Sequence, residues 1–237
     1  MTPLKKRLMR GALDTLYRTS AYRLLQVKWQ GVGVIFTLHH IRPNVDQAKF
    51  APNRILDITP EFLDQTLSQV KRMGFDIIDL DEAYHRLMEQ RFDQPFVVFT
   101  IDDGYLDNLT EALPVFQKHQ APFTVYVCTG FPDGQVFMWW EVLERIVRDH
   151  DEVSVTVNDQ AFEFTTISTD EKYTAFNQIY WALRKLPHVE QYAEAMKISD
   201  QYAFDWQELV RECSMNWDQI RQLQSDPLVT IGAHMIH

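Results

Sequence analysis

The stretch that decides the fold is FVVFTIDDG at residues 96–104, in which a run of six strand-forming residues is followed by two aspartates and a glycine. A mostly apolar run of this length is typical of a strand buried on both faces. The stretch VGVIFTLHH at residues 32–40 has the same form and ends in two histidines. We therefore expect two buried strands of one sheet, each followed directly by titratable side chains.

Outward from these two stretches, strands alternate with segments of helical periodicity. Further strands are expected at 75–78, 123–128 and 228–232, and helices at 60–73, 81–90, 108–119, 139–150 and 217–224. Asn216 and Gln219 have the spacing of a capping box at the start of the last helix. Strands that alternate with helices indicate an α/β fold, a parallel sheet with helices outside it.

Residues 152–211 interrupt this alternation. Apolar residues recur at every second position on both sides of Asn158-Asp159, which predicts an antiparallel hairpin. Helical segments fill roughly 170–211. We therefore divide the chain into a basic helical region at 1–30 and one α/β domain at 31–237, with a hairpin-plus-helices insertion at 152–211.

Composition bounds the class of protein. The 237 residues are 46% hydrophobic with a net charge of −10, which suits a globular domain and excludes a disordered chain. A net-negative chain does not fit a general nucleic-acid binder, and no stretch is long and apolar enough to suggest a transmembrane helix. The two cysteines, Cys128 and Cys213, form neither a zinc cluster nor a disulfide framework, and Cys128 is expected to fill the core.

Residues 1–30 carry seven basic residues against one acidic residue. Polar and charged residues interrupt the apolar run that a secretory signal would need, and the spacing of the leucines predicts an amphipathic helix. Two interpretations stay open: the helix packs on the domain, which we favour, or it docks weakly on an anionic membrane surface. We expect a cytoplasmic protein, peripheral at the membrane in the second case.

Three predicted strands end in metal-binding or titratable residues, namely His39-His40, Asp102-Asp103 and His234. The carboxyl ends of parallel strands meet at one face, where active sites of α/β proteins lie. Each feature alone has a structural explanation, an Asp-Gly turn or a hydrogen-bonded histidine. Together they favour a site in which one aspartate binds a divalent ion such as zinc and its neighbour acts as a base, which indicates a metal-dependent hydrolase.

These residues also resemble a known family. The stretch FTIDDGY at 99–105 resembles the TFDDGY motif of the polysaccharide deacetylases, the NodB homology domain, and residues 215–234 resemble the segment that leads into its second motif, H-[ST]-x-x-H. Residues 37–40 resemble the first strand of the family and residues 121–131 the strand after the first motif. The resemblance implies a distorted, incomplete TIM-like (β/α) barrel.

The resemblance also implies roles for individual residues. Asp102 is expected to be the catalytic base, and Asp103 and His234 are expected to be ligands of a divalent metal ion, with zinc the ion we favour. The implied substrate is an N-acetylated polysaccharide or oligosaccharide, hydrolysed to acetate and a free amine. Metal polarises the acetyl carbonyl while Asp102 removes a proton from water.

The chain departs from the family pattern after His234. Met235 replaces the usual Ser or Thr, and the second histidine of the motif is expected at position 238, one residue beyond His237. We therefore expect a C-terminally incomplete domain that is inactive by itself, with one strand edge unpaired. An adapted loop that lets His237 replace the missing ligand is the less favoured alternative.

Two other functions stay open. A degenerate domain of this type binds carbohydrate or a protein partner without turnover. A metal-dependent phosphodiesterase needs basic residues near the strand ends, for which Arg42 is the clear candidate. Aromatic residues near the expected site are weighed as sugar-stacking groups and, preferentially, as core packing: Tyr105, Phe131, Trp139 and Trp140.

Overall fold

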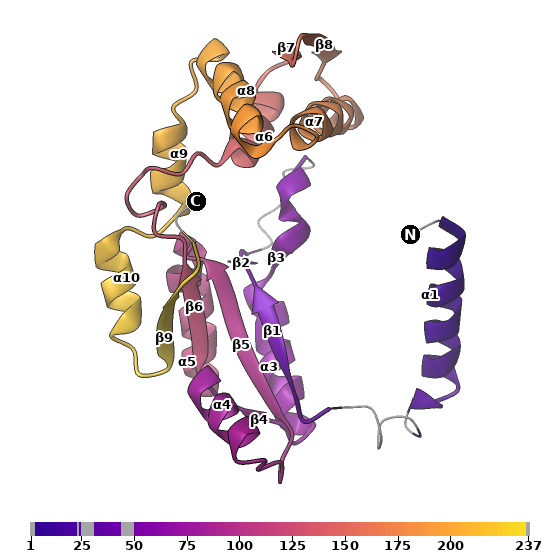
Figure 1. Cartoon of the computed structure of the whole chain (residues 1–237), viewed down its shortest axis with the longest axis vertical. Helices are drawn as coiled ribbons and strands as arrows, with labels where there is room; N and C mark the ends of the chain where they lie inside the picture. The colour runs from indigo at the N-terminus through magenta and orange to yellow at the C-terminus, as the bar shows by residue number, and fades with distance from the viewer. Residues whose placement is uncertain (1–2, 23, 25–30, 44–49, 236–237) are drawn as a thin grey trace.

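The computed structural model describes residues 3–22, 24, 31–43 and 50–235, and its centre is a five-stranded parallel sheet (Figure 1). The order of neighbouring strands is β1-β5-β6-β9, and β4 also pairs with β5. The strands are β1 (Gly33–Leu38), β4 (Asp76–Ile77), β5 (Phe96–Asp103), β6 (Phe123–Val127) and β9 (Val229–Ala233). The predicted α/β class with a parallel sheet is confirmed, and the sheet is open.

Strand β5 organises the sheet. One of its edges pairs with the whole of β1, from Gly33 opposite Phe96 to Leu38 opposite Ile101. The other edge is shared, because β4 pairs with residues 96–97 and β6 with residues 100–103. Because every pairing is parallel, the strands end together at the edge of the sheet that carries the candidate residues.

Helices α3 (Pro60–Arg72), α5 (Leu113–His119) and α10 (Trp217–Gln224) cover one face of the sheet. Their caps follow from the sequence: Thr59 accepts a hydrogen bond from the backbone N–H of Phe62, and the capping box of Asn216 and Gln219 is present. The core they enclose contains large apolar side chains from helices and strands, among them Leu63, Leu67, Phe99, Phe116, Phe123 and Leu223. Helix α4 (Leu80–Met88) covers the opposite face where Phe96 and Val98 lie.

The prediction of a first strand buried on both faces is wrong. Val34, Ile35 and Phe36 of β1 are 41%, 54% and 39% exposed. An apolar sequence makes a strand suitable for burial, but the strand is buried only where other elements cover both faces of the sheet. In the described part of the chain β1 has β5 as its one strand neighbour, so it forms an edge of the sheet.

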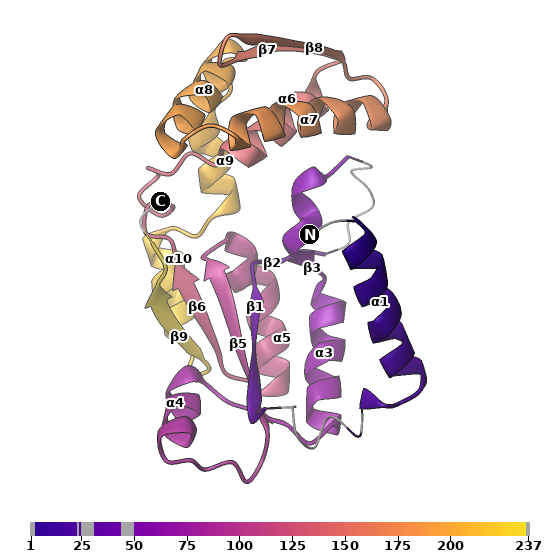
Figure 2. The same cartoon turned by 45° about the vertical axis from the view of Figure 1, so that its right-hand side comes forward.

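Residues from α6 to α9 form a second unit, here called the lobe. It consists of α6 (Trp139–Asp149), the antiparallel strands β7 (Glu152–Val157) and β8 (Gln160–Thr165), α7 (Thr169–Arg184), α8 (His188–Gln201) and α9 (Trp206–Cys213). The predicted hairpin is confirmed, and Asn158 and Asp159 at its turn both have positive φ. The lobe has a hydrophobic core of its own that includes α6, so this unit begins before residue 152. It lies over the carboxyl ends of β5 and β6 (Figures 1 and 2).

Shorter elements connect the two units. The two-residue strands β2 (His40–Ile41) and β3 (Asp57–Ile58) pair in parallel, and the 3-10 helix η1 (Pro52–Leu56) lies between them in sequence. After β5 the chain forms a π-helical turn, η2 (Asn108–Ala112), which continues into α5. Pro114 lies in the first turn of α5, so the predicted break in this helix is found at the π-to-α junction.

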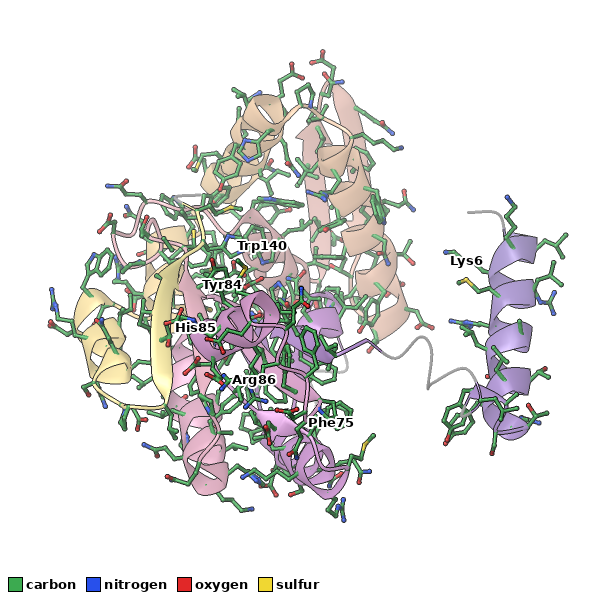
Figure 3. The ribbon with its side chains drawn as sticks, turned by 60° about the horizontal axis from the view of Figure 1, so that its bottom comes forward. Lys6, Phe75, Tyr84, His85, Arg86 and Trp140 are labelled. Atoms are coloured by element: carbon green, nitrogen blue, oxygen red, sulfur yellow. The ribbon has the colours of Figure 1, made fainter. Side chains whose placement is uncertain are left out.

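Helix α1 (Pro3–Arg18) stands apart from the sheet, as Lys6 illustrates in Figure 3. Its apolar side chains are exposed, with Leu8 at 65% and Leu13 at 57%. The favoured expectation that this helix packs on the domain is therefore not what the structure shows. Among the residues described, no helix has the length and apolar character needed to cross a bilayer.

Candidate active site

Three of the predicted residues come together at the carboxyl ends of the strands. The register places His39 beside Asp102, and the pairing of β6 with β9 brings His234 to the same face. The Nε2 atoms of His39 and His234 lie 4.0 Å and 3.6 Å from Oδ2 of Asp102. All three side chains are between one-sixth and one-third exposed, so the group is both held by the fold and reachable from solvent.

Asp103 is placed differently. Successive strand residues point to opposite faces, so Asp103 does not simply continue the side of Asp102. Its φ of +77° is in the left-handed region, and Gly104 follows with a φ of +84°. A left-handed non-glycine residue stores backbone strain, which is concentrated at functional sites. The turn expected from the Asp-Gly sequence is present, and it directs Asp103 into a cleft that Tyr105 also lines.

The donors at these strand ends have the chemistry that a divalent ion prefers, imidazole nitrogen and carboxylate oxygen. Among the described residues, however, no group of three or more His, Cys, Asp or Glu side chains is arranged to hold a metal ion. His234 lies against Asp102, whereas the carboxylate of Asp103 faces the cleft. The described residues therefore supply part of a donor set, and His237 lies outside them.

His40 is a structural residue, unlike its neighbour His39. Its Nδ1 lies 2.7 Å from the Asp107 carboxylate, and its ring stacks on Tyr105 with centroids 3.6 Å apart. Arg42 donates to His40 Nε2 over 3.2 Å, which leaves Nδ1 as the protonated nitrogen that donates to Asp107. His40 is 5% exposed, so these contacts hold it in place.

Asp107 and Arg42 connect the strand ends to the segment after β1. The Asp107 carboxylate also accepts hydrogen bonds from the Ile41 backbone and from Nε of Arg42, at 3.2 Å each. Burial alone would lower the pKa of Arg42. The negative charges of nearby carboxylates outweigh the effect of burial, so the pKa of Arg42 is raised; these carboxylates are Asp57, Asp107 and Glu141. Because these carboxylates already balance the Arg42 charge, Arg42 does not provide the free phosphate contact that the phosphodiesterase alternative needs.

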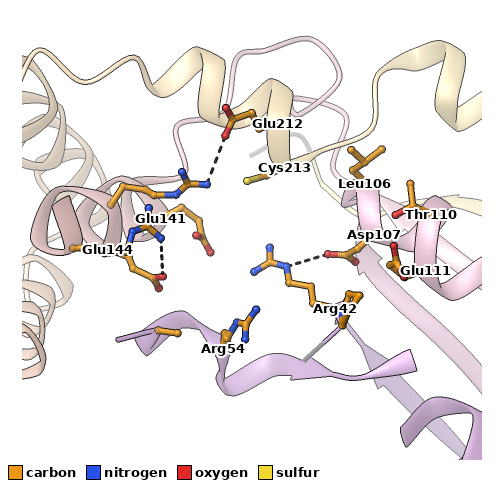
Figure 4. Close-up of a pocket in the computed structure, with 14 residues that line it drawn as sticks. Arg42, Arg54, Leu106, Asp107, Thr110, Glu111, Glu141, Glu144, Glu212 and Cys213 are labelled. Carbon is orange, nitrogen blue, oxygen red and sulfur yellow. Dashed lines mark hydrogen bonds and ion pairs between the residues drawn. The ribbon is translucent and has the colours of Figure 1, made fainter. Parts of the chain in front are cut away.

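A charged cavity of about 440 Å³ lies behind this network, between η2 and the lobe (Figure 4). Arginines and carboxylates alternate along its wall. Three ion pairs join them, Arg42 with Asp107, Arg145 with Glu212 and Arg148 with Glu144, and Figure 4 marks these pairs with dashed lines. Glu144 is buried next to Glu141. Burial, followed by the charge of Glu141, raises the pKa of Glu144 to about 7. The charged residues that line this cavity therefore form an ionic layer between the sheet and the lobe.

Most aromatic residues near the site are core residues. Tyr105, Phe131 and Trp139 are 4%, 4% and 5% exposed, so the preferred expectation of core packing holds for them. Burial, followed by the charges of Asp103 and Glu141, raises the pKa of the Tyr105 hydroxyl. Trp140 is the exception, because it is only partly buried where it lines the cleft that begins at His39 and Asp103.

Two groups of site residues could not be assigned from the sequence. Asp107 lies 67 positions from His40, and the acidic residue alone gives no signal of that pairing. The other group is an aromatic stripe on α7, inside the segment treated as an insertion: Tyr173, Phe176, Tyr180 and Trp181. Their spacing of three, four and one residues is the available signal, since it places them along one side of a helix.

A known protein family matches the part of the chain that contains Asp102, Asp103 and the aromatic residues of α7. The model of the family described as polysaccharide deacetylase matches residues 89–192. The resemblance to the polysaccharide deacetylases is thus confirmed. The matched region contains β5 with Asp102 and Asp103, and it continues through α6 and α7 of the lobe into α8. It therefore includes much of the segment that the sequence assigned to an insertion.

Solved deacetylase structures are also similar to this chain. A de-N-acetylase from Aggregatibacter actinomycetemcomitans is 12% identical over 86% of this chain and 55% of that one, with a TM-score of 0.48. The deacetylase domain of BpsB from Bordetella bronchiseptica is 15% identical over 84% and 53%, with a TM-score of 0.40. The deacetylase PplD from Streptococcus pyogenes is 24% identical over 43% of each chain, with a TM-score of 0.35. The chain thus spans about half the length of these structures, and no curated protein matches it.

Proposed function

We propose that this polysaccharide deacetylase domain is part of a metal-dependent hydrolase that removes N-acetyl groups from amino-sugar polysaccharides or oligosaccharides. One observation carries the proposal: Asp102 lies between His39 and His234 at the carboxyl ends of three strands. A carboxylate that is partly open to solvent can accept a proton from water, as a general base does. The family match over Asp102 supports the same chemistry.

In the proposed reaction Asp102 accepts a proton from the attacking water. The water oxygen forms a bond with the acetyl carbon, the bond from that carbon to nitrogen breaks, and the nitrogen takes up the proton that Asp102 accepted. The products are acetate and an amine. His39 and His234 flank the Asp102 carboxylate at 4.0 Å and 3.6 Å. Asp103 and His234 are the residues that would hold a divalent ion, zinc in our proposal, which when bound polarises the acetyl carbonyl.

The test is acetate release from N-acetylglucosamine oligomers, with zinc supplied, by the full-length hydrolase of which this domain is proposed to be part. We expect Asp102→Asn to lower kcat by at least a hundredfold, the usual contribution of a general base. Asp200→Asn is the control, because Asp200 is an exposed residue on α8. Oligomer binding without any acetate release would support the degenerate, non-catalytic alternative and would overturn the enzymatic proposal.

We further propose that the protein is cytoplasmic and contacts the membrane surface weakly through α1. Support comes from the exposed leucines of this helix and from its positive charge. The helix contains one aspartate and five basic residues, namely Lys5, Lys6, Arg7, Arg10 and Arg18. A basic helix with an exposed apolar side binds in the plane of an anionic bilayer surface.

A further inference from the structure

The hairpin of β7 and β8 has one covered edge and one open edge. On the β7 edge, the backbone N–H of Ser154 donates to the hydroxyl of Tyr202 over 2.9 Å, and its carbonyl accepts a hydrogen bond from Gln201 over 2.7 Å. Strand β8 pairs with β7, and within the described part of the chain no other strand pairs with it. The hairpin lies at the end of the lobe that is farthest from the central sheet (Figures 1 and 2).

The register of the hairpin shows which backbone groups lie on the open edge. Ser154 is opposite Glu163, and the backbone groups of Ser154 bond to residues at the end of α8 rather than to β8. In an antiparallel pair of this kind the backbone N–H and carbonyl of Glu163 point away from β7, and the same holds at every second residue, for Ala161 and Thr165. All three residues are exposed. The open edge therefore presents a row of backbone donors and acceptors, which is a template for a further strand.

The charge of the hairpin limits what can pair with this edge. Residues 151–165 contain Asp151, Glu152, Asp159 and Glu163 but no lysine, arginine or histidine. Two copies of this hairpin placed edge to edge would bring these like charges together, whereas lysine or arginine on a neighbouring strand would lie beside Glu163 with opposite charge. Charge therefore favours a basic strand over a second copy of this chain.

A groove of about 520 Å³ between β8 and α7 selects the side chains on the other face of an added strand. Phe162, Trp181 and Leu186 supply apolar lining, and among the described lining residues Lys185 is the one charged side chain, the remaining polar ones being amides. Because side chains alternate between the two faces of a strand, every second side chain of a strand beside β8 would point to this groove. Apolar side chains fit there, whereas lysine or arginine would meet the charge of Lys185.

From these observations we propose that the open edge of β8 binds an extended basic segment of a partner protein as an antiparallel third strand. The apolar side chains of this segment enter the groove, and its lysine or arginine side chains lie beside Glu163 on the exposed face. In strand addition of this kind, backbone hydrogen bonds give affinity and pockets for alternate side chains give specificity. The surface belongs to the lobe and does not use Asp102, so the inference goes beyond the proposed deacetylase function and is independent of it.

The experiment measures binding of a fluorescein-labelled heptapeptide of alternating lysine and valine to the whole chain by fluorescence anisotropy. In the proposed antiparallel pairing the backbone N–H groups of the lysines face β8, so we expect N-methylation of the lysines to weaken binding at least tenfold. N-methylation of the valines is the matched control and should leave the Kd within about twofold. We expect a heptapeptide of alternating glutamate and valine to bind at least tenfold more weakly than the basic one. These comparisons use the unaltered protein, so they do not depend on the folding of a variant.

Two variants test the edge from the side of the protein. Ala161→Pro removes one backbone donor without changing the charge, and we expect it to weaken binding of the basic peptide roughly fivefold to tenfold. We expect Glu163→Lys to weaken it roughly threefold to tenfold, and Glu61→Lys, at an exposed position on α3, is the control with the same change of charge. Equal binding of the two methylated peptides, or of the acidic and basic peptides, would overturn the proposal. A dimer in sedimentation equilibrium that Ala161→Pro dissociates would also overturn it, because a second copy would then occupy the edge.

Discussion

Replacing Glu144 by glutamine tests the ionic layer between the sheet and the lobe. The Glu144 carboxylate accepts a hydrogen bond from the backbone N–H of Asn53 and lies 3.9 Å from Arg148. Glutamine keeps an oxygen acceptor of nearly the same size and removes the titration. The variant therefore isolates the effect of placing a carboxyl group in this buried position.

The sign of the effect follows from the raised pKa of Glu144, 4.5 ordinarily and about 7 in the folded protein. Below pH 4.5 the group is protonated in both states. Between these pH values the folded state keeps a proton that the unfolded state has lost, so the free energy of unfolding falls as pH rises. Above about pH 7 the free energy of unfolding stays lower by about 3 kcal/mol, because each unit of pKa difference corresponds to about 1.4 kcal/mol.

The assay is urea unfolding followed by tryptophan fluorescence at several pH values from 4 to 8. We expect Glu144→Gln to gain about 3 kcal/mol over the wild type between pH 4 and pH 8, with most of the gain between pH 5 and 7. Glu163→Gln, at an exposed position on β8, is the matched control and should show no such trend. A stability difference between Glu144→Gln and the wild type that does not change with pH would refute the reasoning.

Three further predictions concern other parts of the chain. Asp107→Asn removes the negative charge that contacts Arg42 and His40, and we expect the free energy of unfolding, measured by thermal unfolding, to fall by about 1–3 kcal/mol. An unchanged Tm would contradict this. Because Asp103 and His234 are only part of a donor set, we expect this domain by itself to bind zinc weakly or not at all in calorimetry, and tight one-to-one binding that His237→Ala abolishes would show that His237 completes the site. For α1 we expect binding to phosphatidylglycerol vesicles but not to phosphatidylcholine vesicles, with loss in the double variant Leu8→Glu, Leu13→Glu; equal binding to both lipids would reject electrostatic docking.

Local chemistry made much of the fold predictable. The strand at residues 96–101, the capping box at Asn216 and the turn at Asn158-Asp159 all depend on residues close in sequence, and the structure contains each of them. The grouping of His39 with Asp102 was also accessible, because parallel strands bring their carboxyl ends together.

What could not be predicted depends on contacts between distant segments. The exposure of Ile35 follows from the absence of a covering layer over β1 in the described residues, which an apolar run does not reveal. The aromatic side chains of α7 were assigned to an insertion because helical periodicity does not show which stripe of a helix faces a cleft. His40 was indistinguishable from His39 until its pairing with Asp107 was known.

The separate hydrophobic cores of the sheet and the lobe have an evolutionary consequence. Strand β5, which positions Asp102, packs in the core of the sheet, whereas α7, which positions Trp181, packs in the core of the lobe. Substitutions inside the lobe can reshape the cleft without moving the strand ends. Natural selection can therefore alter the aromatic wall on α7 while Asp102 and its neighbours are left untouched, so that the two sides of one cleft are inherited as two nearly independent parts.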